Sequence, residues 1–115
     1  MFDEGKLIAS CVSFFIHAGH VPVYPLEAHH SCLLWDYQEV LSLLRSHPCV
    51  VAAISGHTHD YVHSIDEVSG IHFLSMPGIV EIQPGSNGFG TILVHEDKLV
   101  LRGVGEVQSI EMMFP

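Results

Sequence analysis

Basic side chains are scarce in this sequence. Its 115 residues include four Lys and Arg against thirteen Asp and Glu, which gives a formal net charge of −9 at pH 7. Nucleic-acid phosphates require a basic surface, and anionic membranes attract polybasic segments. The charge balance therefore argues against both kinds of partner. A chain of this length holds one domain with one modest core.

Cysteines and long apolar runs are also few. Cys11, Cys32 and Cys49 are odd in number and show no Cys-x-x-Cys spacing, which argues against a disulfide framework or a cysteine zinc site. We expect reduced, partly buried thiols in a cytoplasmic protein. The apolar stretch at residues 7–16 is too short to cross a bilayer. It has an acidic start and no cleavage site, so we interpret it as part of a buried strand rather than a signal peptide.

The first half of the chain predicts a strand, a helix and a second strand. Residues 11–17 form a nearly continuous apolar run typical of a strand covered on both faces. Two prolines at 20–25 predict an extended loop that continues through 27–32. Residues 36–46 predict a helix, since apolar residues at 37, 40, 41 and 44 follow helical spacing and Asp36 and Glu39 resemble a capping box at its start. Residues 49–54 are a second buried strand, so the order indicates a βαβ unit.

The second half predicts strands without a helix after Pro48. Residues 61–65 and 71–74 flank a turn and indicate a hairpin. Residues 90–95 and 99–103 indicate two further strands around a short turn. The fold class is therefore α/β, with one βαβ unit followed by short antiparallel strands.

Histidine is the residue in excess, with ten copies. Gly56-His57-Thr58-His59-Asp60 follows the second strand, and Gly19-His20 follows the first. Parallel strands deliver such residues to one edge of a sheet, so we expect His20, His57 and His59 to converge as metal ligands. The preceding glycine permits an unusual backbone or the close approach of a metal. The competing interpretation is chance, because a His-x-His pair arises easily in a histidine-rich chain; the other seven histidines receive no role.

A longer series of motifs resembles a known family. Gly56-His57-Thr58-His59 resembles the GHxH signature of calcineurin-like metallophosphoesterases, and Gly19-His20-Val21-Pro22 resembles the histidine block that precedes it. Over about residues 19–105 the series is similar to the C-terminal half of the manganese-dependent ADP-ribose/CDP-alcohol diphosphatases. It also includes His20-Val-Pro-Val-Tyr-Pro25, Cys32-x-x-Trp35-Asp36-Tyr37, Gly78-Ile79-Val80-Glu81 and Phe89-Gly90-Thr91.

The resemblance implies half of a double-sheet sandwich with two divalent metals at strand ends. His20 and His57 would bind the second metal and His59 the first. Mn²⁺ is the metal expected first, with Fe²⁺, Zn²⁺ or Mg²⁺ as alternatives. The implied substrates are nucleoside-diphosphate-linked small molecules such as ADP-ribose and CDP-alcohols, with Tyr24, Cys32 and Trp35 as substrate neighbours. Trp35 could also be a core residue at the start of the helix.

The departures from the family matter equally. Its Asp-x-His, Gly-Asp and Gly-Asn-His-Asp/Glu blocks do not occur here, and Asn87, the sole asparagine, precedes Gly88. The bridging aspartate, the asparagine ligand and the catalytic histidine would therefore be missing. We expect a truncated product, a partial gene model or a degenerate copy that is inactive alone, with an unpaired sheet edge. The alternatives are a non-catalytic metal- or partner-binding remnant and, less compatible with the helix, a small all-β metal protein.

Overall fold

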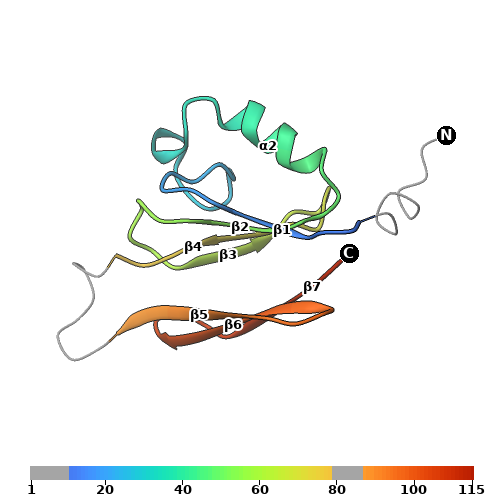
Figure 1. Ribbon diagram of the computed structural model, residues 1–115. Coiled ribbons are helices and arrows are strands. Elements are labelled where there is room, and N and C mark those ends of the chain that lie inside the picture. The colour runs from blue at the N-terminus through green and yellow to red at the C-terminus, as the bar shows by residue number, and fades with distance from the viewer. Residues whose placement is uncertain (1–10, 79–86) are drawn as a thin grey trace.

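The computed structural model describes residues 11–78 and 87–115 and arranges them in three layers (Figure 1). A helix covers one face of a four-stranded sheet, and a three-stranded sheet lies against the other face. The motif positions 79–81 fall outside the described residues. The elements are β1 (Phe15–Ala18), η1 (His30–Cys32), α2 (Tyr37–Arg45), β2 (Val50–Ser55), β3 (Val62–Ile65), β4 (His72–Ser75), β5 (Gly88–Val94), β6 (Lys98–Gly105) and β7 (Ile110–Met113).

The first sheet confirms the predicted βαβ unit and hairpin. Its strand order is β1-β2-β4-β3, with β1 and β4 parallel to β2 and with β3 antiparallel to β4. Helix α2 buries Leu41 and Leu44 against Val50 and Phe73 of the sheet. Asp36 stands at its N-cap but makes no side-chain capping hydrogen bond, so the predicted capping box is wrong. In the described part of the chain, no helix is long and apolar enough to cross a membrane.

The second sheet completes the sandwich. Its order is β5-β6-β7, and both pairs are antiparallel. Leu99, Leu101 and Met112 from this sheet pack with Ala52 and Leu74 from the first. The sequence predicted β5 and β6 but not β7. The four residues of β7 are too few for an alternation of apolar and polar side chains to be recognised.

Strand β1 departs from the expectation of burial on both faces. Among the described strands it has one neighbour, β2, and its side chains Phe15 and Ile16 are 57% and 40% exposed. A groove of about 370 Å³ runs between this edge and the second sheet, where Phe14 stacks on Phe114 with ring centroids 4.4 Å apart. An apolar run cannot distinguish a central strand from an edge strand, which is why the prediction failed.

The cysteine prediction is wrong for two of the three residues. Cys11 and Cys49 form a disulfide with Cα atoms 5.7 Å apart, whereas Cys32 is a free thiol. The two cysteines precede parallel neighbours β1 and β2, and the fold therefore brings them together across 38 positions. Disulfides are rare in the cytosol, so the cytoplasmic location expected from reduced thiols loses that support.

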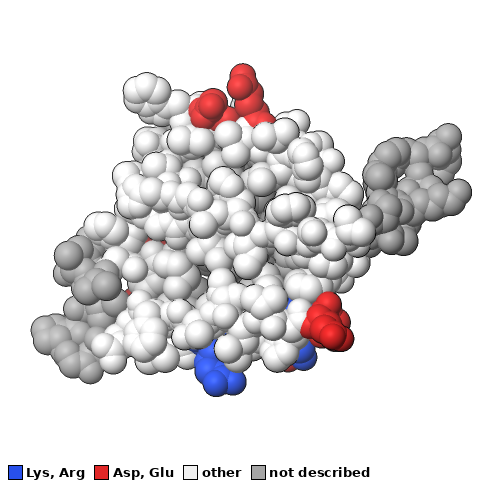
Figure 2. Space-filling view, in the orientation of Figure 1, with Lys and Arg blue, Asp and Glu red and all other residues white. Residues whose placement is uncertain are grey.

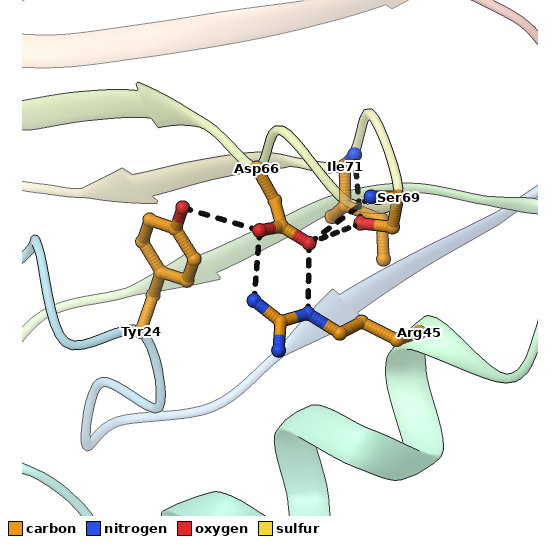
Figure 3. Close-up of polar contacts among 5 residues, drawn as sticks. All are labelled: Tyr24, Arg45, Asp66, Ser69 and Ile71. Atoms are coloured by element: carbon orange, nitrogen blue, oxygen red, sulfur yellow. Dashed lines mark hydrogen bonds and ion pairs between the residues drawn. The ribbon is translucent and has the colours of Figure 1, made fainter.

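Asp66 joins three segments on the helical side of the first sheet (Figure 3). Its carboxylate, in a residue only 2% exposed, accepts hydrogen bonds from Arg45 Nε at 2.9 Å and Nη2 at 2.8 Å. It also accepts from Ser69 Oγ at 2.7 Å and from the Tyr24 hydroxyl at 3.3 Å. The Arg45 guanidinium is the main cause that holds the pKa of Asp66 well below its usual range. Helix α2, the β3–β4 turn and the loop after β1 are thereby tied together.

Charged groups are sparse on the face of the molecule shown in Figure 2, where the basic side chains lie at the lower end. On the second sheet, Lys98 of β6 pairs with Glu111 of β7 at 3.1 Å, and the carboxylate of this pair is largely exposed. Exposed ion pairs contribute little to stability because water screens them. This pair is therefore a matched control for the buried one.

We predict that Asp66→Asn lowers the free energy of unfolding at pH 7 by about 3 kcal/mol, because Arg45 then loses its charged partner in a low-dielectric site. Glu111→Gln should change it by less than about 1 kcal/mol. The folded-state pKa of Asp66 is depressed, so its contribution is complete above the ordinary value of 3.8 and is lost as the pH falls below it. Urea denaturation should show the wild-type and Asp66→Asn curves approaching each other in acid; a constant gap would contradict this account.

Candidate metal and substrate site

The backbone pairing of β1 and β2 continues past the ends of both strands. Gly19 N–H donates to the Ile54 carbonyl at 3.0 Å, and Gly56 N–H donates to the His20 carbonyl at 2.9 Å. These two bonds hold the residues that follow each strand side by side at the carboxyl edge of the sheet. Such an edge is where open α/β sheets bind ligands.

His20 and His57 meet at this edge. Their ring centroids lie 5.2 Å apart with the planes at 77°, and both residues are exposed. The exposed His59 ring instead packs over Gly78, whose own N–H donates to the His59 carbonyl at 3.2 Å. Within residues 11–78 and 87–115, no three His, Cys, Asp or Glu side chains lie close enough to hold one metal ion. The structure thus pairs two of the predicted ligands and does not bring all three to one centre.

Two histidines of this loop adopt a backbone conformation that L-residues rarely use. The φ angle is 69° at His57 and 66° at His59, in the left-handed region that glycine normally occupies. We expected Gly56 to supply the unusual backbone, but the positive φ angles fall on the histidines instead. Non-glycine residues in this region cost of order 1 kcal/mol or more and persist where the surroundings determine them. The observed strain therefore favours a functional role for the loop.

Hydrogen bonds from β4 hold the strained loop in place. Thr58 Oγ1 lies 3.1 Å from Ser75 Oγ, and Ser75 is fully buried at the end of β4. A Cβ atom on Gly78 would lie 2.7 Å from His59 Cγ, so only glycine fits there without movement. Sequence reasoning missed the support from Ser75, because this serine carries no recognisable spacing relative to the histidines. It included Gly78 in a motif of the resemblance but did not predict its contact with His59.

A pocket of about 580 Å³ opens beside the histidine pair. It is lined by His57 and by the segment that leads into helix α2, including Cys32 and Trp35. Cys32 is partly exposed, and the Trp35 side chain is fully exposed. Trp35 is therefore not the core residue that the start of a helix suggested. Two of the three predicted substrate neighbours share a pocket with a predicted metal ligand.

Tyr24 lies elsewhere. It is buried, it stacks on Phe73 with ring centroids 4.3 Å apart, and its hydroxyl donates to Asp66. Its pKa is raised, mainly by burial and then by the Asp66 charge. The ring is thus part of the core that supports the loop, and no face of it remains for a ligand to stack on. The tyrosine's position after His20 suggested a substrate contact, but the chain turns inward there.

Glu27, in the loop after β1, has a buried carboxyl group. The sequence did not single out this residue. It is 5% exposed, and its Oε1 atom has no hydrogen-bond partner among the residues that the structure describes. Burial raises the pKa of this carboxyl to about 7. It borders a small cavity shared with His17, Gly19 and Ser55. A carboxyl with this pKa gains or loses its proton near neutral pH, so the charge that it places behind the site depends on the pH.

Known proteins with similar sequences share one function name. A manganese-dependent ADP-ribose/CDP-alcohol diphosphatase from Xenopus laevis is 49% identical over 90 residues, which is 78% of this chain and 25% of that protein. The protein of that name from Homo sapiens is 41% identical over 88 residues, which is 76% of this chain and 25% of that protein. The one from Oryza sativa is 37% identical over 99 residues, which is 86% of this chain and 30% of that protein. No protein-family model matches the chain.

The fold has a close counterpart among solved structures. A dimetal phosphatase from Danio rerio superposes with a TM-score of 0.85 at 32% sequence identity. The match covers 97% of this chain and 37% of that structure. The chain thus spans about a quarter of the length of the curated relatives it matches. In sequence over most of its length and in fold over nearly all of it, the chain belongs to the family of the manganese-dependent ADP-ribose/CDP-alcohol diphosphatases.

Proposed function

We propose that this chain supplies part of the active site of a metal-dependent hydrolase that cleaves pyrophosphate bonds in nucleoside-diphosphate-linked compounds such as ADP-ribose and CDP-alcohols. The observation that carries the proposal is the contact between His20 and His57 at a sheet edge beside a pocket. The names of the relatives, which specify manganese dependence and these substrates, support it. The dimetal description of the similar structure supports a metal at this edge.

The donor set fits part of the coordination shell of a divalent metal. His20 and His57 would share one metal through ring nitrogens, and His59 would contribute to a neighbouring one. Mn²⁺ is the first candidate, with Fe²⁺, Zn²⁺ or Mg²⁺ as alternatives, because imidazole suits borderline ions and the relatives are named for manganese. A metal bound there would polarise the phosphoryl group and activate water at neutral pH. The buried Ser75 contact and the strained backbone would fix where the imidazoles stand.

The pocket next to the pair would hold the nucleotide part of the substrate. Its wall contains the exposed Trp35 ring, and an exposed aromatic face can stack on a nucleobase. Cys32 lines the same pocket and is uncharged in its thiol form, so it would contact the substrate by packing. The diphosphate would then lie toward His57. The chain's negative charge does not oppose this arrangement, because a bound cation dominates the local field.

We propose further that the chain alone binds metal without turnover. Its histidines give at most a partial shell, since the described residues contain no group of three ligands. A metal held by few protein ligands keeps open coordination positions. A site built from these histidines has no shared carboxylate to hold two cations together. The same observation favours a second candidate, a non-catalytic metal- or partner-binding domain.

We predict that wild-type chain binds Mn²⁺ and that His57→Gln lowers the affinity at least about tenfold, because a ligand nitrogen is lost. His29→Gln is the matched control: this histidine is also exposed in a nearby loop, where its ring contacts His30 rather than the candidate pair. Electron paramagnetic resonance of free Mn²⁺ in a titration gives both affinities.

The same samples test turnover, with ADP-ribose and CDP-choline as substrates. Metal binding without hydrolysis would support the partial site. Hydrolysis by the chain alone would overturn the proposed inactivity and establish the enzyme. Equal affinities in wild type, His57→Gln and His29→Gln would contradict the assignment of the ligands.

We predict that ADP-ribose quenches the fluorescence of Trp35, the single tryptophan of the sequence, in the presence of Mn²⁺. Stacking on the base changes the environment of a ring that is fully exposed without ligand. Ribose 5-phosphate, which has no base, should leave the fluorescence unchanged. Calorimetry should show that Trp35→Ala weakens ADP-ribose binding by about 1–3 kcal/mol, whereas Leu43→Ala, an exposed apolar change away from the pocket, does not. Equal quenching by both ligands would refute base stacking.

A further inference from the structure

A second pair of histidines lies on the β3–β4 hairpin, away from the candidate site. His63 of β3 and His72 of β4 approach with Nε2 and Nδ1 3.0 Å apart. The two rings are nearly coplanar, with planes within 4° of parallel and centroids 5.2 Å apart, so they meet edge to edge. One ring nitrogen therefore donates its proton and the other accepts it.

The strand register fixes this approach. His63 stands opposite Leu74 and His72 stands opposite Ile65, which makes the histidines diagonal neighbours on one face of the hairpin. Leu74 packs between the sheets, so that face is the one turned toward the second sheet. Both histidines remain partly exposed, and β3 is the edge strand of its sheet. Solvent ions can thus reach the pair, while the backbone holds the two side chains at a nearly constant separation.

The distance matches the spacing of two ligands on one metal ion. Imidazole nitrogens bind Zn²⁺ at about 2.0–2.1 Å, and two of them at the usual angles stand about 3 Å apart. In the hydrogen-bonded pair the two nitrogens point at each other. Both rings must therefore turn on their side chains before the nitrogens can face one ion. Burial lowers the pKa of both His63 and His72. Both rings are therefore neutral at pH 7, which is the form that binds metals.

We propose that His63 and His72 form a second metal site, which takes an imidazole-seeking transition ion, Zn²⁺ or Cu²⁺, and bridges β3 to β4. Two bonds to the metal form and the hydrogen bond between the rings breaks. The donor ring moves its proton to its outer nitrogen by exchange with water, so no proton is released overall. No third His, Cys, Asp or Glu joins the pair among the described residues, and water completes the shell. This site does not depend on the proposed function, because it uses none of the same residues.

Calorimetric titration with Zn²⁺ and the nitrogen hyperfine pattern of bound Cu²⁺ test the proposal on the full chain. We expect His63→Gln and His72→Gln each to weaken Zn²⁺ binding at this site at least about tenfold. His95→Gln changes an exposed histidine in the β5–β6 turn and should leave binding unchanged. The double variant His20→Gln/His57→Gln should retain the site, which separates it from the candidate active site.

A variant could lose binding because the hairpin is disturbed. His72→Cys addresses this, since a thiolate is also a zinc ligand. It should keep Zn²⁺ binding that His72→Gln loses, and amide NMR spectra should show the same fold in both. Wild-type affinity in both Gln variants, or loss of all Zn²⁺ binding in His20→Gln/His57→Gln, would overturn the proposal.

Discussion

The parallel pairing of β1 with β2 is the constraint on which the site depends. It continues for one hydrogen bond beyond each strand, through Gly19 and Gly56. Backbone bonds of this kind set the positions of the following residues without help from their side chains. His20 and His57, 37 positions apart in the sequence, are therefore neighbours before any metal is present. Preorganisation of this type reduces the cost of ordering ligands around an ion.

The surroundings of the pair are held by contacts on the helical side of the sheet. Asp66 ties the loop through Tyr24 and the helix through Arg45, and both attachments converge on one buried carboxylate (Figure 3). The segment between the two attachments carries Cys32 and Trp35, the pocket wall. Because a buried charge without its partner is costly, this network fixes one arrangement of the loop. A surface loop that contains several prolines and histidines thus becomes one side of a defined pocket.

Sequence reasoning recovered the elements whose patterns are local. The helix stripe ending at Leu44, the largely buried strand β2 and the hairpin of β3 and β4 all follow from spacing within a few residues. The Gly-His positions after two strands indicated where His20 and His57 meet. Features that depend on distant contacts escaped it: the Cys11–Cys49 disulfide, the inward turn of Tyr24, and the positive φ of His57 and His59. Each is set by a neighbour far away in the chain, which a local pattern cannot contain.

In the site that we propose, His20 and His57 share one metal ion at the carboxyl edge of the first sheet. An anomalous-diffraction map of crystals soaked in Mn²⁺ tests it most directly, because manganese scatters anomalously and marks its own position. The proposed site should give a peak within bonding distance of a ring nitrogen of both residues, beside the pocket that Trp35 lines. A map with no manganese peak at that edge, or with one that only a single imidazole reaches, would contradict it.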